Sequence, residues 1–246
     1  MIMNFAPPIA FCLFPAMLFF LELGRRLRLR QPPLSGSTPI EGAVFGLFGL
    51  LLAFTFSGAM TRYDTHRLLL TQEVNSISTA YLYLDLLPIP TQLSLRQLFR
   101  EYTNSRLHLF QAVGNEISPD SIRLQGEIWR RAVTAAAASD AHPDATKLLL
   151  PALNTMFGMP TARQNAFHMH PPEIVFLLLF VFGCGCALMA GYSTKAERQD
   201  WVYSVALAAT VTLTVYATLE IEFPRLGLIR FTQLDQPLLV LRDSMK

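Results

Sequence analysis

Four long apolar stretches dominate the pattern of hydrophobic and polar positions along the chain. They cover roughly residues 4–23, 40–61, 173–192 and 201–221. Each is about as long as the ~20 apolar residues that a helix needs to cross the hydrocarbon core of a bilayer. The stretches form two pairs, and a polar segment separates the pairs. We therefore expect an integral membrane protein with four transmembrane helices in two hairpins.

The polar segment between the pairs has the periodicity of amphipathic helices. Apolar residues recur on one side of a helix that continues from the second apolar stretch into solvent: Leu70, Val74, Ile77, Tyr81, Leu84 and Leu87. Spacings of three and four place them on one helical face, and Pro88 ends the helix. Further helices are predicted over 94–114, from Pro119 to about Ser139, and over 144–157. No segment has the alternation of a strand, so the predicted fold class is all-α.

These patterns divide the chain into four parts. We expect a first transmembrane hairpin over residues 1–61 and a helical solvent-facing domain over residues 62–172. A second transmembrane hairpin over residues 173–222 and a C-terminal tail over residues 223–246 complete the chain. The helical domain is thus inserted between the second and third membrane helices.

Two local signals refine this picture. Ser118 is a suitable N-cap for the helix that Pro119 opens, because a serine side chain accepts from the free backbone N–H groups of a first turn. Glu22 has Arg25 and Arg26 within one helical turn. At that spacing opposite charges form ion pairs on the helix surface.

Composition and charge agree with membrane embedding. Hydrophobic residues make up 52% of the chain, and charged residues only 15% against about a quarter in soluble domains. The net charge of +2 gives no basis for a nucleic-acid partner. The three cysteines, Cys12, Cys184 and Cys186, all lie in apolar stretches, so the solvent-facing domain has no disulfide framework.

Small residues recur on one face of two of the predicted membrane helices. On the second stretch they are Gly42, Gly46 and Gly49, and on the third they are Gly183, Ala187 and Gly191. Small side chains let the backbones of membrane helices approach closely. We therefore expect these six residues to be helix-packing positions.

Three parts of the chain carry a family resemblance. The first is the segment 41–54 that leads to 62–64, and the second is 73–82 with 100–102 after it. The third combines Leu153-Asn154-Thr155-Met156 and Arg163 with Phe223-Pro224-Arg225-Leu226-Gly227-Leu228-Ile229-Arg230. Together they resemble the bacterial bestrophin-like domain family.

The resemblance implies a multi-pass protein of the bacterial cytoplasmic (inner) membrane that forms a homo-oligomer around a central pore. Bestrophins are anion channels with a narrow apolar neck on the second transmembrane helix. By that analogy the partners would be membrane lipid, further copies of the chain and inorganic anions. The alternative is a non-conducting scaffold or sensor whose helical domain binds a partner protein.

Aromatic and aliphatic residues follow one face of the second stretch. A ring of Phe48, Leu52 and Phe56 from several subunits would form a pore constriction that gates by dewetting. Arg62 and Arg67, just beyond it, would attract anions. The alternative is that these apolar side chains face lipid and the arginines lie among headgroups.

The orientation of the solvent-facing domain is left open by two opposing arguments. Arg25, Arg26, Arg28 and Arg30 follow the first stretch, and basic loops are typical of the cytoplasmic side. This would place the helical domain outside the cytoplasm. The bestrophin analogy implies the reverse, because the bulk of those proteins is cytoplasmic.

Polar residues gather just after the second stretch. Glu73, Asn75, Ser76 and Thr79 form a polar cluster that would bind an ion or a polar partner, or would be a solvated helix face with interhelical hydrogen bonds. Glu220 and Glu222 close the fourth stretch. Carboxylates are costly in a membrane, so they mark either an ion path or simply the membrane–water interface.

The sequence offers little for catalysis or metal binding. His168 and His170 are a short pair without further ligands at metal-site spacing, and Cys184 and Cys186 lack a redox or metal spacing. Phosphate-binding loops, nucleophile elbows and His-Glu-x-x-His motifs are absent from the sequence. We therefore expect no catalytic residue, no metal, no cofactor and no enzyme activity.

Overall fold

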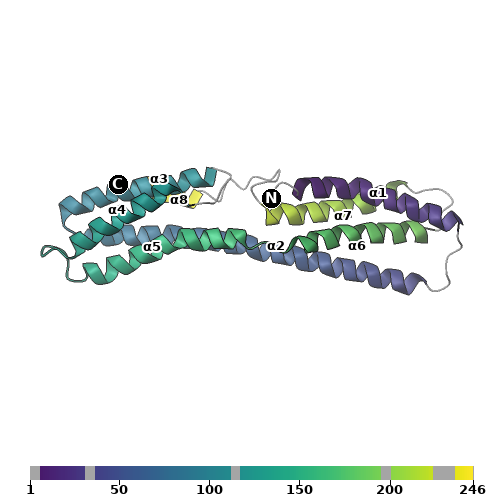
Figure 1. Cartoon of the computed structure of the whole chain (residues 1–246), viewed down its shortest axis with the longest axis horizontal. Coiled ribbons are helices and arrows are strands. Elements are labelled where there is room, and N and C mark those ends of the chain that lie inside the picture. Colours follow the sequence, from purple (N-terminus) through teal and green to yellow (C-terminus); the bar gives the residue numbers. More distant parts are fainter. Residues whose placement is uncertain (1–5, 31–36, 112–116, 195–200, 224–235, 246) are drawn as a thin grey trace. The chain divides into compact units, whose positions relative to one another are not determined.

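A computed structural model describes residues 6–30, 37–111, 117–194, 201–223 and 236–245 of the chain (Figure 1). Its elements, in chain order, are α1 (Ala6–Arg30), α2 (Ser37–Leu82), η2 (Tyr83–Leu86), α3 (Ile89–Gln111), α4 (Pro119–Ala136), α5 (Ala145–His168), α6 (Glu173–Ser193), α7 (Trp201–Glu222) and α8 (Gln236–Ser244). The described ranges contain helices and no strand, which confirms the all-α fold class.

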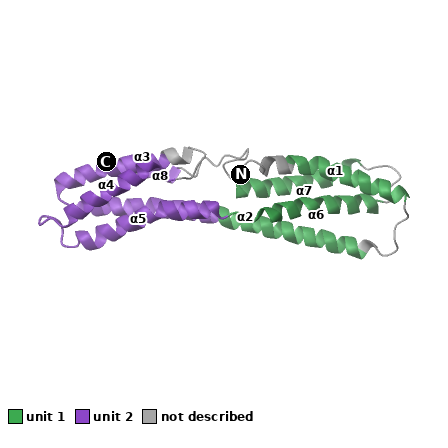
Figure 2. Cartoon of the chain, viewed as in Figure 1, with its two compact units in different colours: residues 1–63, 170–230 green, residues 64–169, 231–246 purple. Residues whose placement is uncertain are grey.

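The chain divides into two compact units (Figure 2). Unit 1 comprises residues 1–63 and 170–230, and unit 2 comprises residues 64–169 and 231–246. Helix α2 contributes its first part to unit 1 and its second part to unit 2. The predicted continuation of the helix beyond the second apolar stretch is therefore confirmed, and the solvent-facing character of its second part stays a prediction.

Three helical stretches are long and apolar enough to cross a membrane. Among the described residues they are Pro39–Leu86, Ala145–Ser193 and Trp201–Glu222. They contain the second, third and fourth stretches predicted from the sequence. The first predicted stretch lies in α1, and the side chains of residues 1–10 are outside the described part of the chain. A fourth span and the pairing into two hairpins remain expectations.

Unit 1 is built on the packing of α1 against α6 and α7. Its buried core contains Leu13, Met17 and Leu21 of α1, Cys184 and Ala187 of α6, and Ala208, Val215 and Leu219 of α7. Two glycines set the distance between α1 and α6. A Cβ on Gly191 would lie 2.0 Å from the carbonyl oxygen of Leu21, and one on Gly24 would lie 2.0 Å from that of Leu188.

Unit 2 has a hydrophobic core of its own. The predicted apolar face is buried there, with Leu70 and Ile77 of α2 and Leu84 of η2 at most 4% exposed. Helix α4 begins as expected, because the Ser118 side chain accepts from the backbone N–H of Ser121 at 3.1 Å. Helix α8 belongs to the same core through Leu238 and Leu241. The last part of the predicted tail is thus a packed helix.

Some helix boundaries differ from the predicted ones. Helix α1 continues through the four arginines to Arg30, since arginine favours helix formation and cations suit the negative end of the helix dipole. Helix α5 was expected to end near residue 157 but continues to His168 with Pro151 and Pro160 inside it. Pro160 is buried, and its packing offsets the loss of the backbone hydrogen bond that a proline cannot form.

Candidate functional site

Two groups of buried charged residues are the candidate sites, one in each unit. The Glu222 cluster of unit 1 comprises Arg62, His170 and Glu222. The Glu73 cluster of unit 2 comprises Glu73, Arg106 and Arg163. Buried charges are rare unless they are paired, so each cluster marks a position where a buried carboxylate needs nearby positive partners.

In the Glu222 cluster, one carboxylate receives groups from two other segments. Nε of Arg62 lies 2.9 Å from both oxygens of Glu222, and Nη2 lies 2.7 Å from Oε2. Nδ1 of His170 lies 3.2 Å from Oε1. The Glu222 side chain is 1% exposed, whereas those of Arg62 and His170 are 30% and 28% exposed. The cluster therefore ties α2 and the segment before α6 to the end of α7.

Aromatic packing holds the histidine in place. The ring of His170 lies 4.9 Å from that of Phe223, which in turn lies 6.3 Å from the ring of Phe176 at the start of α6. Two residues before Glu222, the buried carboxylate of Glu220 accepts a hydrogen bond from the hydroxyl of Tyr216, which lies one turn earlier on α7. Both glutamates at the end of α7 are thus buried and partnered rather than exposed.

This geometry bears on the predicted role of Arg62. A cation attracts ions at a distance only to the extent that its field is not cancelled by a nearby opposite charge. Glu222 compensates Arg62 at hydrogen-bond distance. Arg67, the other residue predicted to attract anions, is exposed on α2 within unit 2. Anion attraction by either residue stays a prediction.

In the Glu73 cluster, two guanidinium groups share one carboxylate. Nε of Arg106 on α3 lies 2.7 Å from Oε1 of Glu73 on α2. Nη1 of Arg163 on α5 donates to Oε2. Glu73 is completely buried, and the arginine side chains are 6% and 11% exposed. The cluster therefore cross-links three helices inside the core of unit 2.

Tyr102 extends the polar region on α3. Its hydroxyl accepts a hydrogen bond of 3.3 Å from Nε2 of Gln125 on α4. Burial of the phenol raises the pKa of Tyr102 to about 12, while the positive charge of Arg106 opposes this shift. Tyr102 is therefore a neutral hydrogen-bonding group at physiological pH.

The structure separates the members of the predicted polar cluster. Glu73 is buried, but Asn75 and Thr79 are exposed, and Ser76 donates to the backbone carbonyl of Glu73 at 2.8 Å. The partners of Glu73 are two arginines that sequence reasoning did not assign to the site. The sequence held one signal for Arg106. It follows Tyr102 by four residues, and this spacing places both residues on the buried face of α3.

The predicted pore residues have different surroundings within one chain. Phe48 is 5% exposed and packs in a small cluster with Leu179 and Cys186, and Leu52 is half-buried. Phe56 is 40% exposed. Within a single chain Phe48 is therefore a packing residue, and a pore lined by the three positions stays a prediction.

The predicted packing glycines fall into two groups. A Cβ on Gly183 would contact Leu13 at 3.5 Å, Ala187 is fully buried, and Gly191 touches α1. Among the described residues, no atom lies within 4 Å of such a Cβ on Gly42, Gly46 or Gly49. The small-residue face of α6 is therefore used in packing against α1, whereas the described residues leave that of α2 open.

The described residues contain no group of three histidine, cysteine or acidic side chains placed to hold a metal ion. Cys184 and Cys186 are free thiols buried in unit 1. His168 is exposed, while His170 belongs to the Glu222 cluster.

A family model described as "Bestrophin-like domain" matches residues 9–233, which is most of the chain. No curated protein and no solved structure matches the sequence.

Proposed function

Because the chain belongs to the bestrophin-like domain family, we propose that it is a multi-pass membrane protein that assembles as a homo-oligomer and conducts inorganic anions. In this proposal α1, the first part of α2, α6 and α7 form four spans in two hairpins. The membrane is the bacterial cytoplasmic membrane. Helix α2 lines the pore, and Phe56 is one of its constricting side chains.

One observation carries the proposal beyond family membership. The apolar window of the α2 stretch is only 11% buried within the chain, against 33% and 22% for the windows of the α6 and α7 stretches. Gly42, Gly46 and Gly49 leave open space on that uncovered helix. Small residues of this kind let a helix of another subunit approach closely. This arrangement supports α2 as the helix that faces other subunits.

Chloride flux tests this function directly. Protein reconstituted into liposomes is expected to release trapped chloride, and Phe56→Ala is expected to change the rate because it widens an apolar constriction. Phe19→Ala is the matched control, since Phe19 is a 63% exposed phenylalanine on α1. Absence of flux from the wild-type protein, with a monomer in detergent, would remove this function.

A non-conducting scaffold or sensor is the second candidate. Ile122, Trp129 and Val133 are 58%, 41% and 39% exposed, and their spacing places them on one face of α4. An exposed apolar face on a solvent-facing domain favours a protein partner. This function predicts a partner that crosslinks to unit 2, loss of that partner in Trp129→Ala, and no effect of Phe56→Ala on ion movement.

A further inference from the structure

The last two turns of α1 expose both arginine and leucine side chains. Arginine and leucine alternate from Arg26 to Arg30. Arg26 has a side chain that is 71% exposed, and Arg30 is also exposed. Leu27 and Leu29 between them are 41% and 75% exposed. Both kinds of side chain are satisfied together only where an anionic surface adjoins hydrocarbon, as at the headgroup level of a bilayer.

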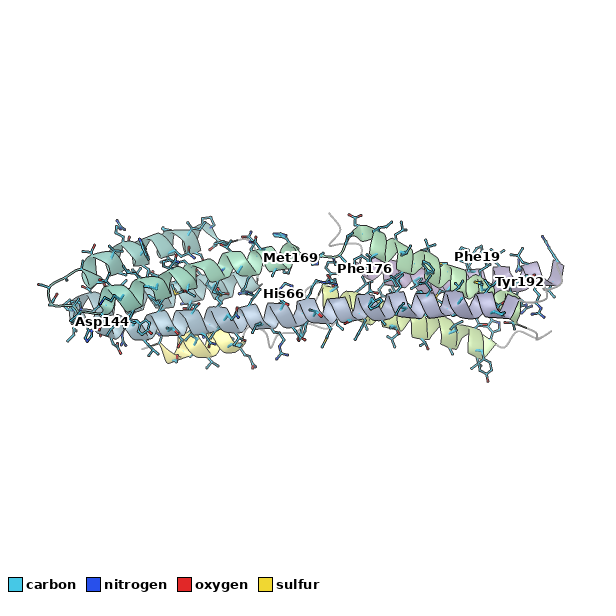
Figure 3. All side chains as sticks on the ribbon, turned by 90° about the horizontal axis from the view of Figure 1, so that it is seen from below. Phe19, His66, Asp144, Met169, Phe176 and Tyr192 are labelled. Atoms are coloured by element: carbon cyan, nitrogen blue, oxygen red, sulfur yellow. The ribbon has the colours of Figure 1, made fainter. Side chains whose placement is uncertain are left out.

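The same end of unit 1 has aromatic residues of the kind found at membrane interfaces. Nη1 of Arg28 donates to the carbonyl oxygen of Tyr192 at 3.1 Å, which joins the end of α1 to the end of α6 (Figure 3). Helix α7 begins at Trp201, only seven residues after the Thr194 that follows α6. Trp201 and Tyr203 are 61% and 75% exposed. Tryptophan and tyrosine are enriched at the headgroup level.

Two of these arginines keep their charge at the surface. The Arg26 side chain is 71% exposed although its Nε lies 2.8 Å from Glu22, and Arg30 is exposed as well. Arg28 donates to a backbone carbonyl, which carries no net charge. Arg26 and Arg30 therefore present positive charge beside the exposed Leu27 and Leu29.

We propose that residues 25–30 of α1 bind the headgroup phosphates of anionic phospholipids. The arginines contact phosphate, and Leu27 and Leu29 contact the upper acyl chains. This inference rests on the proposed membrane embedding of unit 1 and not on conduction, so an absence of chloride flux would leave it standing.

Tryptophan fluorescence reports on lipid at this end of the unit. The chain has two tryptophans, so Trp129→Phe leaves Trp201 as the only one. The protein is reconstituted in bilayers that contain either brominated phosphatidylglycerol or brominated phosphatidylcholine, since bromine quenches a nearby indole. We expect quenching at a lower mole fraction of the anionic lipid. Each arginine near an anionic surface contributes up to about a fivefold preference.

Paired variants test the assignment. Arg26→Gln with Arg30→Gln is expected to lower the preference for the anionic lipid at least fivefold, whereas Arg26→Lys with Arg30→Lys retains most of it. Arg123→Gln with Arg130→Gln is the matched control, because these side chains on α4 are 67% and 72% exposed. The control is expected to keep the wild-type preference.

Two outcomes would overturn the proposal. Equal quenching by the two lipids would show that this end does not select anionic headgroups, as would a preference that survives Arg26→Gln with Arg30→Gln. Inorganic phosphate in the buffer is expected to leave quenching in place, because it lacks acyl chains for the leucines. Displacement of the brominated lipid by phosphate would identify a free-phosphate site instead.

Discussion

The carboxylate of Glu222 holds the guanidinium of Arg62 through three contacts of 2.7–2.9 Å. Arg62 follows the apolar part of α2, and Glu222 is the last residue of α7. Two helices of unit 1 are therefore joined by a bidentate ion pair whose acidic member is buried. Such pairs are sensitive to loss of one partner, because the other is left with a desolvated charge.

We predict that Glu222→Gln lowers the free energy of unfolding of the detergent-solubilised protein by about 2 kcal/mol, the range of a hydrogen bond to a charged group. Thermal unfolding followed by circular dichroism measures this. The double variant Arg62→Met with Glu222→Gln should recover part of the loss in a double-mutant cycle. Asp85→Asn is the control. The Asp85 side chain, which pairs with Arg96, is 58% exposed, so the expected loss is under about 1 kcal/mol.

The Glu73 cluster gives a stronger prediction for unit 2. Glu73→Gln would remove the buried carboxylate that Arg106 and Arg163 share, and the expected loss is about 3–5 kcal/mol. Limited proteolysis of the folded protein should then cut within residues 64–169 at lower protease concentration. Glu101→Gln changes an exposed glutamate of α3 and is expected to behave as wild type. Equal effects of the two substitutions would contradict the structural role of the cluster.

We predict that ionisation of Tyr102 lowers the free energy of unfolding as the pH rises above 10. The pKa of Tyr102 is about 12 in the folded protein and 10.0 for a free tyrosine. Because the folded-state value is higher, the unfolded chain releases its proton first. This contribution is fully present below pH 10, and it is lost as the pH rises to about 12. With 1.36 kcal/mol per pKa unit, the loss reaches about 3 kcal/mol.

Urea unfolding between pH 9 and about pH 12 measures this loss. Tyr102→Phe should flatten the dependence, because phenylalanine has no proton to release. Tyr83→Phe, which changes a partly buried tyrosine at the edge of the core, is the comparison. An unchanged slope in Tyr102→Phe would show that other groups cause the pH dependence.

Gly191→Ala tests the close approach of α1 and α6. Its Cβ would lie 2.0 Å from a backbone oxygen of α1, so the helices must move apart. We expect a loss of about 1–3 kcal/mol, the usual result of overpacking. Gly185→Ala on the same helix is the control. Its Cβ would meet no atom of the described residues within 4 Å, so the variant should be at least as stable as wild type. Similar melting temperatures for both variants would contradict this packing.

The sequence predicted the helices well because hydrophobic periodicity is a local signal. Leu70, Ile77 and Leu84 have the spacing of one helical face, and they are buried as that spacing requires. The predicted end of α5 was wrong, because a proline inside a helix, such as the buried Pro160, depends on tertiary packing that no local pattern reveals. In the same way α8 appeared as part of a tail, although its two leucines are buried in unit 2.

The candidate sites were only partly predictable. Glu73 and Glu222 were recognised as acidic residues of interest, but their partners lie 33 to 160 positions away along the chain. Side-chain pairs at such separation depend on the tertiary arrangement of helices, which a single sequence does not specify. The small-residue face of α2 was likewise visible as a pattern, but its lack of neighbours among the described residues was not.

The most direct test of the central claim measures chloride flux through liposomes that contain a Phe56→Cys variant. Phe56 is the proposed constricting residue of α2 and is 40% exposed within the chain, and Cys12→Ser removes the exposed native thiol. If α2 lines an anion pathway, a charged, membrane-impermeant thiol reagent should block most of the flux through this variant. The same reagent should leave flux through Phe19→Cys unchanged. Flux that is absent before the reagent is added, or that continues unchanged through modified Phe56→Cys, would contradict the account.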